Sequence, residues 1–138
     1  MKQLLLDTNF LLLPGQFRVD LFGGIAKLMD EPFELIVPEG AIKELKIIAS
    51  TAKAGKPAAK LALQFVADME KKGQLKIVPI EREKGEKGAV KSVDDWIVAY
   101  TKYNPCIVCT NDKGLKNRLK ENKVKTIILR ERSYLGFG

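Results

Sequence analysis

The feature that most constrains the fold of this chain is a set of short, almost continuously hydrophobic runs: Gln3–Leu6, Phe33–Val37, Leu75–Val78, Cys106–Cys109 and Thr126–Leu129. A strand with one face in water alternates apolar and polar residues, whereas a strand buried on both faces is apolar throughout. Strands of the second kind are typical of parallel sheets that helices cover on both sides. The runs therefore predict five strands of a mostly parallel sheet.

Helical patterns fill the gaps between these runs, with apolar residues recurring every three or four positions. The expected helices are Asp20–Met29, Ala41–Ala49, a segment from Gly55-Lys56-Pro57 to the stop at Gly73, Val93–Tyr103 and Lys113–Asn122. Strands that alternate with helices predict a three-layer α/β/α domain, here a single domain over residues 1–138 with the strand order 3-2-1-4-5. The charged, glycine-containing stretch Glu81–Ser92 is expected to be a mobile surface loop that could close over Asp94.

Composition narrows the classes of protein that fit. No apolar run reaches the roughly 18 residues of a membrane helix, and Asp7 and Asn9 interrupt the apolar stretch Leu4–Leu13, which is therefore no signal peptide. We expect a cytoplasmic protein. The chain has no histidine and two cysteines, Cys106 and Cys109, inside an expected strand. That pattern fits neither a four-ligand zinc site nor a redox pair at the start of a helix. We therefore expect both cysteines to be small buried side chains.

Four acidic residues stand at equivalent places in the predicted fold. Asp7 ends the first strand, Glu44 lies early in the helix after the second, Asp94 begins the helix that leads into the fourth, and Asp112 follows the fourth strand. In an open α/β sheet, ligands bind beyond the carboxyl ends of the strands, where the strand order reverses. We therefore expect these acids to gather at one edge of the sheet.

Gathered carboxylates suit a hard divalent cation such as Mg²⁺ or Mn²⁺. Such a cation activates water and stabilises charge on a phosphodiester. Asp95 could substitute for Asp94 or assist it, and Thr8, Asn9, Thr110 and Asn111 are candidate orienting donors around the acids. Each acid also has an ordinary interpretation: Asp7 as a turn cap, Glu44 as solvated surface, Asp94 or Asp95 as a helix cap, and Asp112 as the cap of the next helix.

The net charge of +7 is unevenly distributed. Residues 1–100 hold 15 basic and 14 acidic side chains, whereas residues 101–138 hold 9 and 3. A basic excess confined to one segment suggests a polyanionic partner, although a general lysine excess that favours solubility would look similar. Lysines at i, i+3, i+7 and i+10 are expected to form one face of the helix beginning beside Asp112, where they could hold a phosphate backbone: Lys113, Lys116, Lys120 and Lys123.

These segments resemble, in order, the acidic motifs of the PIN-domain ribonuclease family. Asp7-Thr8-Asn9 resembles its opening D-[TS]-[NS], Pro38 to Glu44-Leu45 the segment with its glutamate, Val93 to Ala99 the third acidic stretch, and Thr110 to Leu115 its T-x-D-x-x-L. The resemblance implies a Mg²⁺- or Mn²⁺-dependent endoribonuclease in which Asp7, Glu44, Asp94 and Asp112 are the metal-binding and catalytic residues.

Two branches of the family remain open from the sequence. Leu13-Pro14-Gly15-Gln16-Phe17 and the Asp94-Asp95 pair resemble archaeal relatives of the nuclease that processes small-subunit ribosomal RNA. The VapC-type toxins share the acids and the length, and they would add an antitoxin protein as a partner; a homodimer is a further expectation. The alternative from another class is a non-catalytic RNA-binding or protein-interaction module that retains the acids.

Overall fold

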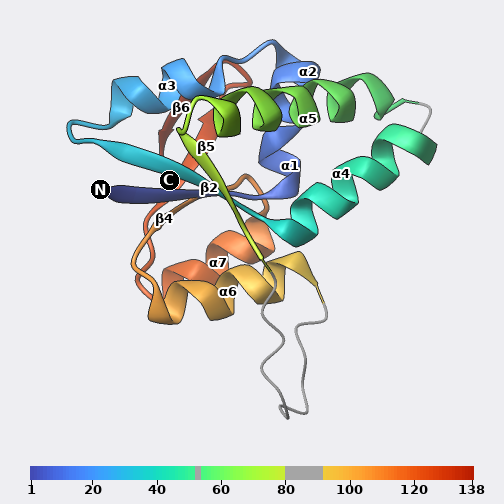
Figure 1. Cartoon of the computed structure of the whole chain (residues 1–138). Coiled ribbons are helices and arrows are strands. Elements are labelled where there is room, and N and C mark those ends of the chain that lie inside the picture. Colours follow the sequence, from blue (N-terminus) through green and yellow to red (C-terminus); the bar gives the residue numbers. More distant parts are fainter. Residues whose placement is uncertain (52–53, 80–91) are drawn as a thin grey trace.

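The computed structural model describes residues 1–51, 54–79 and 92–138 (Figure 1). Its elements, in chain order, are β1 (Lys2–Leu6), α1 (Thr8–Leu11), α2 (Leu13–Phe17), α3 (Leu21–Leu28), β2 (Phe33–Pro38), α4 (Glu39–Thr51), α5 (Lys56–Lys71), β3 (Leu75–Val78), α6 (Val93–Tyr103), β4 (Ile107–Cys109), α7 (Lys113–Glu121), β5 (Thr126–Arg130) and β6 (Tyr134–Phe137). The loop predicted for Glu81–Ser92 lies outside the described residues except for Ser92.

The sheet confirms the predicted order and adds one strand. Its order is β3-β2-β1-β4-β5-β6. The first five strands are parallel, as their apolar runs predicted, and β6 pairs antiparallel with β5 through a tight hairpin. Strand order reverses between β1 and β4, so the carboxyl ends of these two neighbours flank the point where ligands bind in such sheets.

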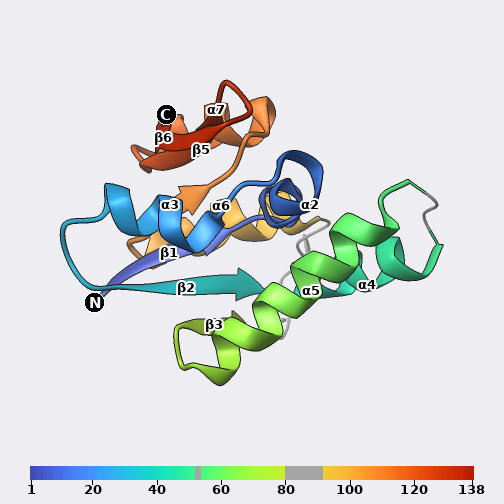
Figure 2. The same cartoon turned by 90° about the horizontal axis from the view of Figure 1, so that it is seen from above.

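Helices cover both faces of the sheet, and the sheet divides the hydrophobic core into two parts (Figures 1 and 2). Residues of β1 and β2 alternate between the two sides: Leu4 and Leu6 pack with α1 to α5, whereas Leu5 packs with α6 and α7. Both sides are apolar because both are covered, which explains why the strands read as continuous hydrophobic runs. The three-layer architecture expected from the sequence is confirmed.

Two short helices at the start of the chain were not predicted. Asp7 caps α1 by accepting a hydrogen bond from the Phe10 backbone N–H, and α2 begins at Leu13-Pro14, where a proline fits the first turn. Gly15 then lets α2 approach α5, because a Cβ at that position would lie 2.5 Å from Ala58 Cα. The chain therefore passes directly from β1 into α1 at Asp7.

Smaller differences concern element ends. Helix α7 ends at Glu121, and Lys123 lies beyond it with a left-handed backbone (φ 58°), so it does not continue the lysine face predicted for that helix. Gly73 (φ 74°) follows the end of α5, as expected for a helix stop. Among the described residues, no helix has both the length and the apolar character needed to cross a membrane.

Candidate functional site

Asp7 stands at the junction of the two central strands. Its backbone N–H donates to the Cys109 carbonyl at 3.3 Å, so the pairing of β1 and β4 continues to the residue that ends β1. The side chain is buried, with 3% of its surface exposed. Its Oδ1 accepts the Phe10 N–H at 2.6 Å, and its Oδ2 accepts a short hydrogen bond from the Thr110 hydroxyl. The Asp7 carboxyl is therefore fixed in orientation by β1, α1 and the end of β4.

Burial raises the pKa of Asp7 from 3.8 to about 6. The hydrogen bonds from Thr110 and Phe10 oppose this increase, and the negative charges of Asp94 and Asp112 add to it. A buried carboxylate loses hydration, and like charges nearby disfavour its ionised form further. Asp94 lines the same pocket as Asp7, and Asp112 is linked to Asp7 through the Thr110 hydroxyl, so both lie at the carboxyl edge expected from the sequence.

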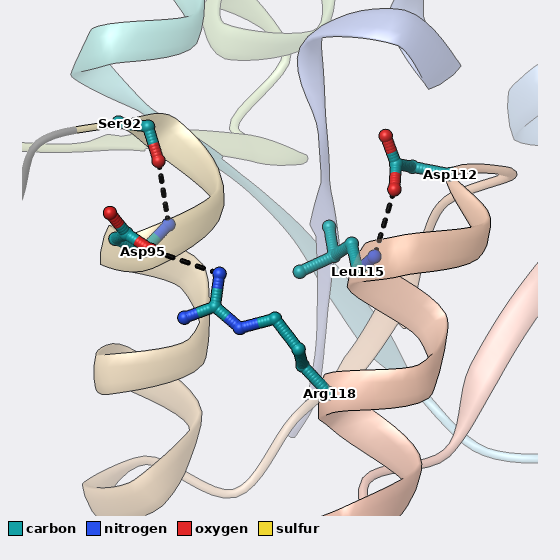
Figure 3. Close-up of polar contacts among 5 residues, drawn as sticks. All are labelled: Ser92, Asp95, Asp112, Leu115 and Arg118. Atoms are coloured by element: carbon teal, nitrogen blue, oxygen red, sulfur yellow. Dashed lines mark hydrogen bonds and ion pairs between the residues drawn. The ribbon is translucent and has the colours of Figure 1, made fainter.

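Asp112 occupies the N-cap of α7, where its Oδ1 accepts the Leu115 N–H at 2.8 Å (Figure 3). The capping interpretation of Asp112 is thus confirmed. Its own N–H donates at 3.0 Å to the Thr110 hydroxyl oxygen, and that hydroxyl in turn donates to Asp7. Thr110 is fully buried and links the two acids through a single side-chain oxygen.

Asp94 and Asp95 both lie in the first turn of α6 but have different neighbours. Ser92, not either aspartate, is the N-cap, because its hydroxyl accepts the Asp95 N–H at 3.1 Å; the capping interpretation of Asp94 and Asp95 was wrong. Asp95 Oδ1 forms an ion pair with Arg118 Nη1 of α7 at 2.9 Å (Figure 3). Burial raises the pKa of Asp94, Asp112 raises it further, and Arg118 opposes both.

A pocket of about 180 Å³ opens at this edge, lined by Asp7, Thr8, Asn9, Glu44, Ser92, Val93 and Asp94. Glu44 comes from α4, is exposed to solvent as its ordinary interpretation expected, and still contributes to the pocket wall. Thr8 is buried at 5% exposure, and its Oγ1 has no hydrogen-bond partner among the described residues. A buried hydroxyl without a partner is uncommon and indicates a place for a water molecule or a ligand atom.

The oxygen donors of this pocket fit a hard divalent cation by their chemistry. Asp7, Asp94 and Glu44 line one pocket, and the pKa of Asp7 is raised mainly by burial and further by the charges of Asp94 and Asp112. A bound cation would favour the ionised form of Asp7. Within residues 1–51, 54–79 and 92–138, however, no three acidic or cysteine side chains are already arranged as a group that could hold an ion.

The remaining predicted site residues differ in their positions and in their contacts. Asn9 is exposed in α1 and lines the pocket. Asn111 uses both ends of its side-chain amide on the Leu129 backbone, accepting at 2.7 Å and donating at 3.1 Å, so it ties the end of β4 to β5. Lys113, Lys116 and Lys120 belong to α7; Lys113 and Lys120 are exposed and Lys116 is half-buried.

The prediction for the cysteines is confirmed for Cys109 and wrong for Cys106, which lies outside the strand and is not fully buried. Both are free thiols; Cys109 is buried in β4, and Cys106 is half-buried just before that strand. Burial raises the pKa of Cys106 to about 11 and that of Cys109 well above its ordinary value. Neither thiol is poised to act as a nucleophile.

Two contributors to the site were not found from the sequence. The sequence predicts Ser92 in the preceding loop, although its spacing to Asp95 matches a helix N-cap followed by an acid in the first turn. Arg118 was not singled out, because its contact with Asp95 joins residues of two helices, and local sequence carries no signal for such a pair.

Comparison with known proteins gives a consistent assignment. A family model described as PIN like domain matches residues 4–132. Ribonuclease VapC4 of Methanocaldococcus jannaschii is 28% identical over 136 residues, which span 97% of this chain and 95% of VapC4. The structure of the PIN domain endonuclease Utp24 superposes with a TM-score of 0.72 at 20% identity, covering 98% of this chain and 90% of that one.

A domain of a functionally unknown protein from Methanocaldococcus jannaschii superposes with a TM-score of 0.63 at 18% identity, over 94% of this chain and 92% of that one. The two structural matches show a shared fold, and the family match extends over nearly all of the sequence. The motif resemblance is thereby confirmed, and the chain belongs to the PIN-like domain family.

Proposed function

We propose that this protein is a divalent-metal-dependent endoribonuclease that uses Asp7, Glu44, Asp94 and Asp112 as its acidic site. The observation that carries the proposal is the state of Asp7, a buried carboxyl with a pKa of about 6 that faces a polar pocket and repels two further aspartates. Burial of a carboxyl beside two further aspartates destabilises the fold, and a bound cation would offset that effect.

Mg²⁺ or Mn²⁺ held there would supply an activated water molecule and stabilise negative charge on the phosphodiester. The residues of the chain have separate tasks. Thr110 and the Phe10 N–H hold the carboxyl of Asp7 in one orientation. The unpartnered Thr8 hydroxyl offers a donor to an oxygen atom bound in the pocket. Asp94 is the better candidate ligand of the adjacent pair, because Asp95 is occupied by Arg118.

RNA as the substrate is supported by the ribonuclease name of the relative that matches over nearly its full length. Lys113, Lys116 and Lys120 lie on the helix that Asp112 caps, so their charges extend from the acidic site along α7. We propose that they contact the phosphate backbone. Lys123, beyond the helix end, is the weaker member of the predicted set.

The VapC name of the same relative supports a VapC-type role over ribosomal RNA processing, and we propose the antitoxin partner and the homodimer with that role. Controlled expression in a bacterial host tests this choice. A toxin should arrest growth, and co-expression of a small protein encoded beside it should relieve the arrest. Normal growth together with cleavage of a ribosomal RNA precursor would favour the processing role.

The catalytic proposal is tested by cleavage of a labelled single-stranded RNA with Mg²⁺ or Mn²⁺. Asp7→Asn should lower the rate by more than about a hundredfold, and Thr110→Val by roughly 10- to 100-fold, the range for partners that orient a metal ligand. Asp20→Asn is the matched control, because Asp20 caps α3 in the same way at an exposed position. Mn²⁺ should also raise the melting temperature of the parent and not that of Asp7→Asn.

Two outcomes would contradict the proposal. If Asp7→Asn cleaves as fast as the parent preparation, the activity belongs to a contaminant or to another site. If the parent binds RNA but cleaves none under any of these metal conditions, the chain is the non-catalytic module that the sequence left as its alternative.

A further inference from the structure

An exposed aromatic ring and an arginine meet where α2 ends. Phe17 is the last residue of α2, and 38% of its surface is exposed. The guanidinium carbon of Arg132, in the turn between β5 and β6, lies 5.9 Å from the centre of the Phe17 ring. That distance is within the range of a cation–π contact. The contact brings together two segments from opposite ends of the chain.

The backbone at this place is unusual for arginine. Arg18 follows Phe17 with φ 56° and ends α2 by donating its N–H to the Pro14 carbonyl at 3.0 Å. Glu131 and Arg132 have φ 52° and 56° in a turn that the Ser133 N–H closes on the Arg130 carbonyl at 3.0 Å. Glycine or asparagine normally fills such left-handed positions, because a Cβ there is unfavourable. Folding alone does not explain why arginine stands at both.

These arginines lie at the edge of the sheet that carries the acidic site. Helix α2 follows α1, whose cap is Asp7, and the β5–β6 turn follows the carboxyl end of β5. Strands β1, β4 and β5 are parallel, so the turn and Asp7 share one edge. Asn111, which precedes Asp112, bonds directly to Leu129 of β5 near the start of that turn.

The chemistry of the group suits single-stranded RNA. An exposed ring offers a face on which a base can stack, and arginines beside it can hold phosphates. Neither Arg18 nor Arg132 forms an ion pair with an acidic side chain within the described part of the chain. Glu131 is the one acidic residue of the turn, so the group of Phe17, Arg18, Glu131 and Arg132 keeps a net positive charge.

We propose that Phe17, Arg18 and Arg132 bind a single-stranded segment of the RNA substrate, with a base on the Phe17 ring and phosphates on the two arginines. This surface rests on the proposed function and extends it. It guides the strand along the α2 side of the carboxyl edge, whereas the lysines of α7 lie on the other face of the sheet.

Binding to a labelled single-stranded RNA of about 12 nucleotides, measured by fluorescence anisotropy in EDTA, tests the surface without cleavage. Phe17→Leu should weaken binding about tenfold, the effect of removing one stacked base. Arg18→Gly and Arg132→Gly should each flatten the slope of log affinity against log salt by roughly 0.7. Because glycine suits the left-handed backbone, both variants should melt at the parent temperature or above it.

The chain supplies matched controls at the opposite edge of the sheet. Lys27 is exposed in the last turn of α3, which leads into the start of β2. Lys27→Gln therefore removes one positive charge at that opposite edge. Tyr103, 84% exposed at the end of α6, controls for the removal of an exposed aromatic ring through Tyr103→Leu. Both controls should bind RNA nearly as the parent does.

Three results would overturn the proposal. One is unchanged affinity and salt slope in the Phe17 and arginine variants. Another is an equal weakening in Lys27→Gln, which would reduce the effect to net charge. The third is a change in self-association, seen by size-exclusion chromatography, without a change in RNA binding, which would make this a protein contact. Cleavage in Mg²⁺ is scored separately: binding that depends on Phe17 without cleavage supports this surface and refutes the nuclease proposal.

Discussion

Asp7 combines a structural role with an electrostatic penalty. Its carboxyl caps α1 and accepts the Thr110 hydroxyl, yet burial raises its pKa from 3.8 to about 6. The folded chain therefore holds a proton at Asp7 more strongly than the unfolded chain does. Stability from this group is greatest below pH 4, decreases as the pH rises towards 6, and stays low above it. At 1.36 kcal/mol per pKa unit, the decrease is on the order of 3 kcal/mol.

We expect this decrease to be visible in urea unfolding of the metal-free protein between pH 4 and pH 7. Asp7→Asn removes the titrating group, so its free energy of unfolding should change much less over the same interval. Asp20→Asn is the control, since Asp20 caps α3 through the Gly23 N–H at 3.0 Å but lies at the surface. A pH dependence in Asp7→Asn as steep as that of the parent would show that another group causes it.

At the residue scale, the ends of the predicted strands identified the candidate acids, whereas the contacts around those acids could not be predicted. Asp7 and Asp112 follow the neighbouring strands β1 and β4, and parallel topology alone brings such positions together. The unpartnered Thr8 hydroxyl and the two amide bonds of Asn111 to Leu129 depend on how α1 and β5 pack. The sequence therefore supported the candidate acids but not the separate tasks of the residues around them.

At the scale of elements, continuous apolar runs identified the five parallel strands, while β6 was missed. Tyr134–Phe137 is short, and the turn before it holds Glu131-Arg132 where a hairpin normally signals itself with Asn-Gly. Helices α1 and α2 were missed because Asp7-Thr8-Asn9 favours a turn and Pro14-Gly15 usually interrupts helices. Each of these elements is held by contacts with distant segments, such as Gly15 on Ala58.

Helices α6 and α7 are joined by the ion pair of Asp95, in the first turn of α6, with Arg118, in the last turn of α7. Both side chains are partly exposed, at 40% and 46%, so the pair should contribute no more than about 1 kcal/mol to stability. Its second effect is electrostatic. Asp112 and Asp95 raise the pKa of Asp94 beyond the effect of burial, and Arg118 lowers it.

We predict that Arg118→Gln and Asp95→Asn shift the pH profile of RNA cleavage in opposite directions. Arg118→Gln removes a positive charge and raises the pKa of Asp94, so the acidic limb should move to higher pH. Asp95→Asn removes a negative charge and should move that limb to lower pH. Both substitutions break the same ion pair, so a purely structural role for it would change both profiles alike. Shifts of the same sign would therefore contradict the electrostatic account.

For the whole molecule, topology and charge distribution were the most predictable properties. When helices cover both faces of a parallel sheet, its strands are continuously apolar, and ligands bind at one edge, beyond the carboxyl ends of the strands. The basic excess of residues 101–138 pointed to a polyanion, although one part of it did not fall as expected. Lys123 left the predicted face because α7 ends at Glu121, and a helix end is set by capping contacts that periodicity does not define.

The lysine face that remains on α7 gives a prediction about the charge of the molecule as a whole. Lys116→Gln with Lys120→Gln should weaken binding to unrelated single-stranded RNAs alike, because phosphate contacts carry no base information. The slope of log affinity against log salt should flatten by roughly 0.7 for each phosphate that the variant no longer binds.

Lys60→Gln with Lys71→Gln makes the same change in net charge on α5, away from α7. If both double variants bind RNA equally weakly, RNA responds to the overall charge of the protein and α7 holds no defined part of the strand. Weaker binding confined to the α7 pair would place the phosphate backbone along the helix that Asp112 caps.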